Sequence, residues 1–139
     1  MFESAELGHK IDKASYRTAI PGLRSALLDA QFEVRENGTF PVVILIAGIN
    51  ESDKSATVNT LYEWMDPRYL STLAPATPTD EERDRPHMWR YWRALPPKGR
   101  IGILSASWYF DPIRARIEED PLAFDQRIDQ INRFENHVG

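Results

Sequence analysis

The sequence contains no cysteine, and its three histidines, His9, His87 and His137, are scattered along the chain. The absence of cysteine excludes a disulfide framework, thiolate catalysis and a cysteine-ligated zinc site. No histidine has a second histidine three or four residues away, as a helical metal-binding pair would. A chain without cysteine suits a reducing compartment, so we expect a cytoplasmic protein with no histidine metal site.

The sequence also lacks an excess of positive charge and a long apolar run. Its formal net charge is −4, whereas nucleic-acid-binding domains usually carry a basic excess that displaces counterions from phosphates. The apolar run VVILIAGI is far shorter than the roughly 18 residues that a membrane span requires. The first residues mix acids and bases and do not resemble a secretory signal. We therefore expect neither nucleic acid nor a membrane as a partner.

Strand-like and helical segments alternate along the chain. The stretch VVILIA is apolar on successive residues, which is typical of a strand covered on both faces in a parallel sheet. A weaker strand is predicted over 69–74, and IGILSAS from Ile101 predicts another short, almost uniformly apolar strand. Apolar spacing predicts helices over 23–34, 54–65 and 87–95, and a last helix with a buried stripe of Leu122, Ile128, Ile131, Phe134 and Val138.

Helix caps punctuate this pattern. Asn37-Gly38 predicts a left-handed helix stop, and Thr79 with Glu82 three residues later predicts a capping box. Asp111-Pro112 and Asp120-Pro121 each place a capping acid before a proline suited to the first helical position.

The order of elements predicts an α/β fold, a three-layer parallel sheet with helices on both faces. We expect a single folded domain over residues 23–139, preceded by an N-terminal extension over residues 1–22. The last helix ends where a further strand should follow, so the domain is expected to be C-terminally incomplete. The edge of VVILIA would then have to be covered by another chain, or the fragment will tend to aggregate.

The stretch GINESDKS, from Gly48 to Ser55, follows VVILIA directly. A strand that leads into G-x-x-x-x-G-K-[ST] and a helix forms a phosphate-binding loop, whose backbone N–H groups and lysine hold the anion. Here Asp53 replaces the second glycine, which adds a Cβ and a negative charge. At about 4 Å and an effective dielectric near 20, one like-charge pair costs about 4 kcal/mol. In the alternative interpretation, Ser52 or Asp53 caps the following helix and no ligand is needed.

Three blocks, VVILIAGINESDKSATVNTLYEWMDPR, RPHMWRYWRALPPKGRIGI and SASWYFDP, resemble the second polyphosphate kinase family in order and spacing. The resemblance covers the chain from about Leu23 to Gly139. It is greatest to the N-terminal half of the two-domain members, the polyphosphate:AMP phosphotransferases. It implies a P-loop, thymidylate-kinase-like fold with an arginine-bearing lid, and phosphoryl transfer between polyphosphate and a nucleotide with Mg²⁺.

The chain departs from the family pattern at positions that carry chemistry. In the family loop, G-x-D-x-x-G-K-G, Asn50 stands where an acid is expected, Asp53 replaces the glycine, and Lys54 matches. The family's D-R-S-W-Y after the third strand becomes Ser105 and Ala106 followed by a matching SWY, and the lid would lie beyond the last residue. Phosphoryl transfer depends on positioning and charge neutralisation, so these changes predict little transition-state stabilisation. We expect no Mg²⁺ binding by this chain.

The stretch RPHMWRYWR carries Arg85, Arg90 and Arg93. On a helix, Trp89 and Trp92 share one face, and Arg90 and Arg93 share a neighbouring face. One interpretation is an anion or nucleotide surface, with arginines for phosphate oxygens and an indole for base stacking. The other places both indoles in the helix–sheet core and pairs the arginines with acids such as Glu81, Glu82 and Asp84.

Three functions follow from these patterns. The first, which we favour, is a pseudoenzyme: the non-catalytic N-terminal module of a polyphosphate:AMP phosphotransferase, which self-associates or pairs with a catalytic C-terminal half. The second is a divergent, active polyphosphate-dependent phosphotransferase. The third is a module that binds polyphosphate or AMP/ADP without catalysis. The residues at issue are the phosphate-loop remnant, Gly48, Asn50, Asp53, Lys54 and Ser55.

Overall fold

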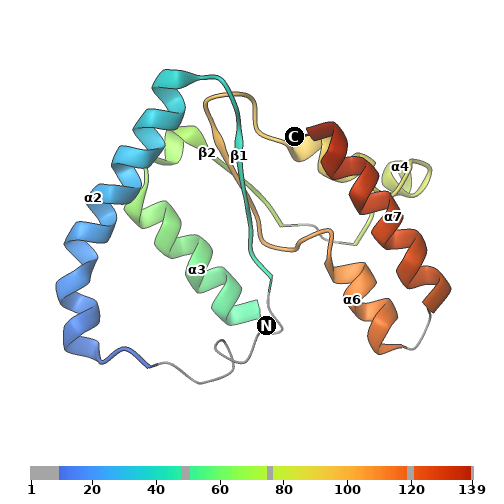
Figure 1. Cartoon of the computed structure of the whole chain (residues 1–139), viewed down its shortest axis with the longest axis horizontal. Helices are drawn as coiled ribbons and strands as arrows, with labels where there is room; N and C mark the ends of the chain where they lie inside the picture. The colour runs from blue at the N-terminus through green and yellow to red at the C-terminus, as the bar shows by residue number, and fades with distance from the viewer. Residues whose placement is uncertain (1–9, 48–50, 75–76, 119–120, 139) are drawn as a thin grey trace.

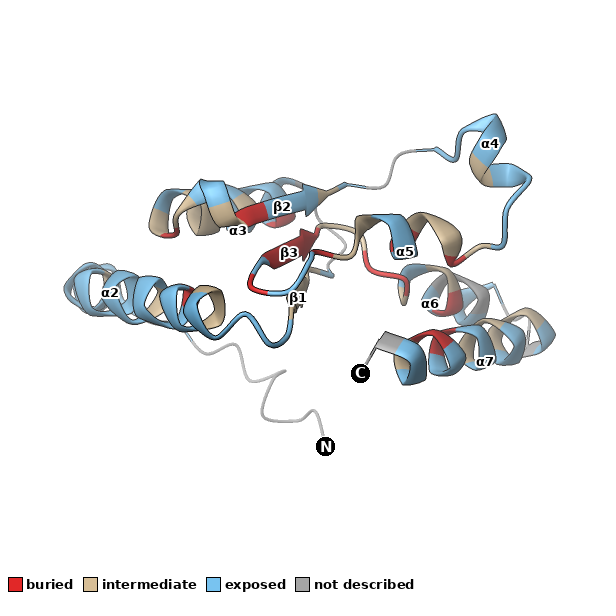
Figure 2. Ribbon diagram, turned by 90° about the horizontal axis from the view of Figure 1, so that it is seen from above, coloured by how far each residue is buried: buried red, intermediate tan, exposed pale blue. Residues whose placement is uncertain are grey.

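The computed structural model describes residues 10–47, 51–74, 77–118 and 121–138. A small sheet lies between two groups of helices (Figures 1 and 2). One group comprises α2 (Lys13–Asn37) and α3 (Glu51–Trp64), and the other comprises α5 (Trp89–Ala94), α6 (Phe110–Ile117) and α7 (Pro121–Val138). This arrangement confirms the predicted α/β class.

The sheet consists of three parallel strands, β1 (Val42–Leu45), β2 (Leu70–Leu73) and β3 (Ile101–Leu104). Their order is β1-β3-β2, so β3 is central, and all four of its residues are buried. Within the described part of the chain β1 is an edge strand, and its four residues are only half-buried. The three strands were predicted correctly, but the central, fully covered position belongs to β3 rather than to VVILIA.

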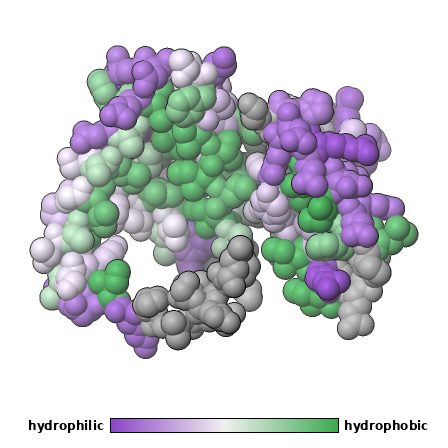
Figure 3. Space-filling view, viewed as in Figure 1, coloured by the Kyte–Doolittle hydropathy of each residue, from purple (hydrophilic) through white to green (hydrophobic). Residues whose placement is uncertain are grey.

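Neighbouring residues of each strand contribute to two separate cores. Ile103 packs into the core against α2 and α3, whereas Leu104 packs into the core against α5 and α7. In β1, Ile44 and Leu45 divide between the two cores in the same way. Figure 3 shows hydrophobic surface at the centre of the face on which β1 lies in front. The sheet therefore joins two cores, and both reach the surface beside β1.

Helix α2 begins ten residues earlier than the predicted start at residue 23. Asp12 caps it by accepting hydrogen bonds from the N–H groups of Ala14 and Ser15, and the helix continues through Pro21. At its other end Gly38 has a φ of 56° and donates its N–H to Val34, which confirms the predicted left-handed stop. None of the described helices is both long enough and apolar enough to cross a bilayer.

The later helices confirm some predicted caps and correct others. Thr79 and Glu82 form the predicted capping box of α4 (Asp80–Arg83). Asp111 is not an N-cap, because α6 begins at Phe110 and places it in the first helical turn. Leu122 was wrongly assigned to the buried stripe of α7, since it is 68% exposed. Helix α7 does begin at Pro121, and its Ile131 and Phe134 are buried as predicted.

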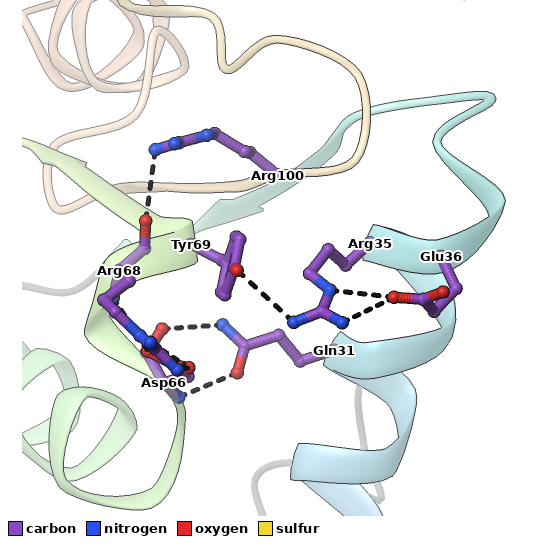
Figure 4. Close-up of polar contacts among 7 residues, drawn as sticks. All are labelled: Gln31, Arg35, Glu36, Asp66, Arg68, Tyr69 and Arg100. Carbon is purple, nitrogen blue, oxygen red and sulfur yellow. Dashed lines mark hydrogen bonds and ion pairs between the residues drawn. The ribbon is translucent and has the colours of Figure 1, made fainter.

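A polar junction fixes α2 to the short helix η1 (Pro67–Tyr69) that precedes β2 (Figure 4). Gln31 is buried; its Nε2 donates to the carbonyl of Asp66 at 2.9 Å, and its Oε1 accepts from the N–H of Asp66 at 2.7 Å. Hydrogen bonds from Arg68 lower the pKa of the Asp66 carboxyl. The guanidinium carbons of Arg35 and Arg100 lie 5.0 and 5.9 Å from the ring centroid of Tyr69. The amino ends of β2 and β3 are thereby anchored, opposite the edge where the strands end.

Candidate functional site

The loops that follow the three strands start at the same edge of the sheet. The N–H of Ile46 donates to the carbonyl of Leu104 at 2.8 Å, and the N–H of Ser105 donates to the carbonyl of Leu73 at 3.0 Å. Ligands of parallel α/β sheets bind at this carboxyl edge, next to helix N-termini. The GINESDKS stretch starts here, but Gly48 and Asn50 lie outside the described residues.

The part of the phosphate-loop remnant that the structure describes lies inside α3. Because α3 begins at Glu51, neither Ser52 nor Asp53 is its N-cap, and the prediction that one of them caps the helix is wrong. Asp53 is exposed in the first turn, where a carboxylate is favoured by the helix dipole. Lys54 is 8% exposed, and Ser55 faces solvent. The helix therefore presents a carboxylate, and not its lysine, at the surface of its first turn.

The segment after β3 folds into a turn that starts α6. Ser107 is buried, and its Oγ accepts a hydrogen bond from the N–H of Tyr109 at 3.0 Å. Trp108 Nε1 donates to Glu135 Oε1 at 3.0 Å, and the Tyr109 hydroxyl donates to the same oxygen. The residues that match the family, Ser107 to Tyr109, thus tie β3 to α7. Glu135 was not among the predicted site residues, since a single acid beside an apolar helical stripe gives no sign of its partners.

We expect Glu135→Gln to lower the pKa of Tyr109 toward its ordinary value. The hydrogen bond to the Glu135 carboxylate, followed by burial, raises this pKa. A raised tyrosine pKa stabilises the fold below the unfolded value of about 10, and this stabilisation is lost as pH rises through the folded pKa. The native protein should therefore lose thermal stability more steeply than the variant above a pH of about 10. Ultraviolet titration of tyrosinate measures the pKa directly.

Tyr109→Phe is the control for this titration, because it removes the Tyr109 hydroxyl and keeps Glu135. The late titration step that this variant loses belongs to Tyr109. Tyr91, whose pKa is raised by its burial and then by Asp111, should still titrate late in both variants. A titration curve unchanged by Glu135→Gln would contradict the assigned cause of the shift.

Arg85, Arg90 and Arg93 lie around α5. The guanidinium carbons of Arg93 and Arg85 are 4.8 and 5.5 Å from the ring centroid of Trp89. Arg90 is mostly buried, and its Nη2 is 3.5 Å from Glu82 Oε2, as the interpretation with paired arginines predicted. Arg90 and Arg93 also line a cavity of about 420 Å³ beside β2. The structure thus separates the three: Arg90 pairs with an acid, whereas Arg85 and Arg93 are exposed.

The two tryptophans of α5 do not both lie in the core, contrary to the interpretation that places both indoles there. Trp92 is 43% exposed and packs edge-on against Phe134 at a centroid distance of 4.9 Å. Trp89 is half-buried. Of the two, Trp92 therefore contacts the core against α7, at Phe134, while Trp89 lies beside Arg85 and Arg93.

The described residues at the carboxyl edge do not by themselves form a Mg²⁺ site. Mg²⁺ is bound through carboxylates together with water and phosphate oxygens. The first two residues after β3 are Ser105 and Ala106, and neither carries a carboxylate. Across the described ranges, no three side chains of His, Cys, Asp or Glu converge on one point. Asp53, in the first turn of α3, is an exposed carboxylate near this edge.

A family model described as polyphosphate kinase 2 (PPK2) matches residues 10–139. The chain belongs to the PPK2 family. Polyphosphate:AMP phosphotransferases from Pseudomonas aeruginosa and Pseudomonas syringae are 51% and 44% identical to it over 137 residues. These matches cover 97% of this chain but 28% of each relative, so the chain spans little more than a quarter of their length. The predicted family is confirmed, while the division of the chain at residue 22 stays a prediction.

Solved structures of the PPK2 family have the same fold over this region. A crystal structure of a polyphosphate kinase 2 from Pseudomonas aeruginosa superposes with a TM-score of 0.88 at 50% identity, covering 99% of this chain and 30% of that chain. A polyphosphate kinase 2 from Arthrobacter aurescens gives a TM-score of 0.83 at 23% identity, covering 95% and 49% of the two chains. The chain therefore corresponds to one part of a larger PPK2 structure.

Proposed function

We propose that this chain is a non-catalytic module of a polyphosphate:AMP phosphotransferase, which works with a catalytic part of such a protein. The observation that carries the proposal is the exposed carboxylate of Asp53 in the first turn of α3. In a working phosphate loop this turn faces the anion with N–H groups and a lysine. A carboxylate at the same place repels phosphate.

The segment after β3 supports the proposal. Phosphoryl transfer is accelerated by groups that neutralise charge, namely lysine, arginine and metal ions held by carboxylates. Ser105 and Ala106 supply none of these groups, and Ser107 is used in the turn that starts α6. The fold of the family and Lys54 are kept, but the first two residues after β3 offer no charged group to a transferred phosphate.

The experiment is an assay of ADP formation from AMP, polyphosphate and Mg²⁺ by the purified chain. We expect no product above a blank without protein, with the Pseudomonas aeruginosa relative assayed alongside as the positive control. Turnover above the blank that disappears in Lys54→Ala would contradict the proposal and establish a divergent active enzyme instead.

Binding without catalysis is a second candidate, favoured by the stack of Arg85 and Arg93 on Trp89. Both guanidinium groups are exposed, and arginines are well suited to phosphate oxygens. Calorimetry with polyphosphate tests this candidate. Arg93→Gln should lower the affinity for polyphosphate about tenfold. Arg17→Gln, at an exposed site on α2, should leave the affinity unchanged. No heat from the native chain at millimolar polyphosphate would exclude it.

A further inference from the structure

A second cavity lies away from the phosphate-loop remnant, between the segment before α5 and the last turns of α7. Its volume is about 380 Å³, within the range of small-molecule pockets. It is lined by Pro86, His87, Met88, Trp92, Gln130, Arg133, Phe134 and His137. None of these residues belongs to the phosphate-loop remnant or to the turn after β3. Both α5 and α7 lie on the same side of the sheet (Figure 2).

The walls of this cavity are aromatic and apolar. Trp92 and Phe134 meet edge-on, with an interplanar angle of 76°, and Trp92 remains 43% exposed. Met88 is buried beneath them, in the core against α7. An exposed indole held rigidly by a second ring is a stacking surface for a planar aromatic group. The apolar part of the cavity therefore fits a flat ring.

The rim of the cavity carries polar groups, among them the guanidinium of Arg133, which can bind an anion. Gln130, Arg133 and His137 follow each other at the spacing that places side chains on one face of α7. His137 Nδ1 lies 2.5 Å from the carbonyl oxygen of Arg133. Because a carbonyl oxygen only accepts, Nδ1 carries the proton, and Nε2 on the other side of the ring is the acceptor of this tautomer, suited to a hydroxyl group of a ligand.

The charge of the residues that line this cavity differs in sign from the net charge of the chain. The chain has a net charge of −4, yet the described residues that line the cavity include one arginine and two histidines and no carboxylate. Asp111 pairs with one of the lining residues, His87, whose Nε2 is 3.0 Å from Asp111 Oδ2. Arg133, which lines the same cavity as Trp92, supplies a fixed positive charge.

We propose that this cavity binds a nucleoside monophosphate, with the base stacked on Trp92, the phosphate held by Arg133, and a sugar hydroxyl donating to His137 Nε2. A ligand in which a short linker joins a flat ring to an anion matches both the aromatic wall and the polar rim. A ring alone or an anion alone would match one of the two. The Gln130 amide, whose oxygen accepts from Arg127 Nη1 at 3.2 Å, keeps its N–H groups for the base or the sugar. The site does not depend on whether the chain is catalytic.

The test is a titration of the full ¹⁵N-labelled chain with AMP, followed through the Trp92 indole N–H and the amides of α7. We expect saturable shifts of Trp92 and of residues 130–137 with AMP. Adenosine should bind about tenfold more weakly, because the charge-assisted contacts are lost, and inorganic phosphate should leave the indole unmoved. Equal responses to phosphate and AMP, or no response of Trp92 to millimolar AMP, would overturn the proposal.

Arg133→Gln separates binding from folding, since Arg133 is exposed and its guanidinium takes no part in the core. This variant should keep the native unfolding midpoint and lose about tenfold in AMP affinity. Arg116→Gln, an equally exposed arginine on α6, should bind AMP as the native chain does. Equal affinity of both variants would assign AMP binding to some other surface and refute the cavity as its site.

Discussion

Asp53→Gly should raise the affinity of the chain for inorganic polyphosphate at least about fivefold, and up to about a thousandfold. Two like charges about 4 Å apart repel by about 1 kcal/mol in water and by about 4 kcal/mol at an effective dielectric near 20, and 1.4 kcal/mol is tenfold in affinity. Because Asp53 is exposed, the lower end applies unless the bound polyanion desolvates the carboxylate. Calorimetry at low ionic strength measures the gain, which salt should reduce.

Asp53→Asn is the matched variant, because it removes the charge and keeps the size of the side chain. If charge alone obstructs the anion, Asn and Gly should gain equally. A gain with Gly alone would assign the obstruction to the Cβ and to the backbone of the first turn of α3. If neither variant gains affinity, the other donors of the loop no longer form an anion site, and our assignment of the block to Asp53 is wrong.

Ile103→Ala should destabilise the fold by about 2–5 kcal/mol. Ile103 is 0% exposed in the central strand, so the truncated side chain leaves a cavity that the surrounding strands and helices cannot fill. A domain of this size has about 5–15 kcal/mol of stability, so the loss removes a large share of it. Urea unfolding followed by circular dichroism gives the change in the free energy of unfolding.

Two control variants test whether the destabilisation by Ile103→Ala comes from the burial of Ile103. Ile103→Val removes one methyl group and should cost about 0.5–1.5 kcal/mol. Ile117→Ala makes the same chemical change at a residue that is 76% exposed, and should change stability by less than about 0.5 kcal/mol. Similar losses at positions 103 and 117 would contradict the central place of β3 in the core.

The local elements of the fold were readable from sequence. Uninterrupted apolar runs identified β1 and β3, because a strand covered by helices on both faces has no polar side to display. Thr79 with Glu82 and the glycine after Asn37 identified helix ends, because caps depend on residues a few positions apart. Strands and helix ends could be predicted because each depends on residues that are close together in the sequence.

Contacts between distant segments were not readable. The order β1-β3-β2 depends on which strands meet in space, so the sequence could not show that the strand from Ile101 would be central. Asp111 looked like a cap because a proline follows it, but it lies 3.0 Å from His87 across the fold. The two hydrogen bonds that Glu135 accepts from Trp108 and Tyr109 likewise join positions 26 and 27 residues apart.

The place of the loop residues between a strand and a helix was predicted, whereas the residue at which the helix begins was not. Lys54, Asp53 and Ser55 do lie at the start of a helix that follows a parallel strand, as the loop pattern requires. The start of α3 at Glu51 could not be read, since Ser52 and Asp53 are both good capping residues and either one is a reasonable N-cap. Gly48 and Asn50 lie outside the described residues, and their predicted roles stay predictions.

The two halves of α2 differ in their contacts with the rest of the protein. From residue 13 to residue 26 nearly every side chain is exposed, and Pro21 lacks the N–H that would bond to the carbonyl of Arg17. Beyond this stretch, Gln31 fixes the helix to Asp66. Isolated helical segments of this length are marginal in water, so the first half frays while the second half persists. Limited proteolysis will therefore shorten the chain from its amino-terminal side and leave the sheet whole.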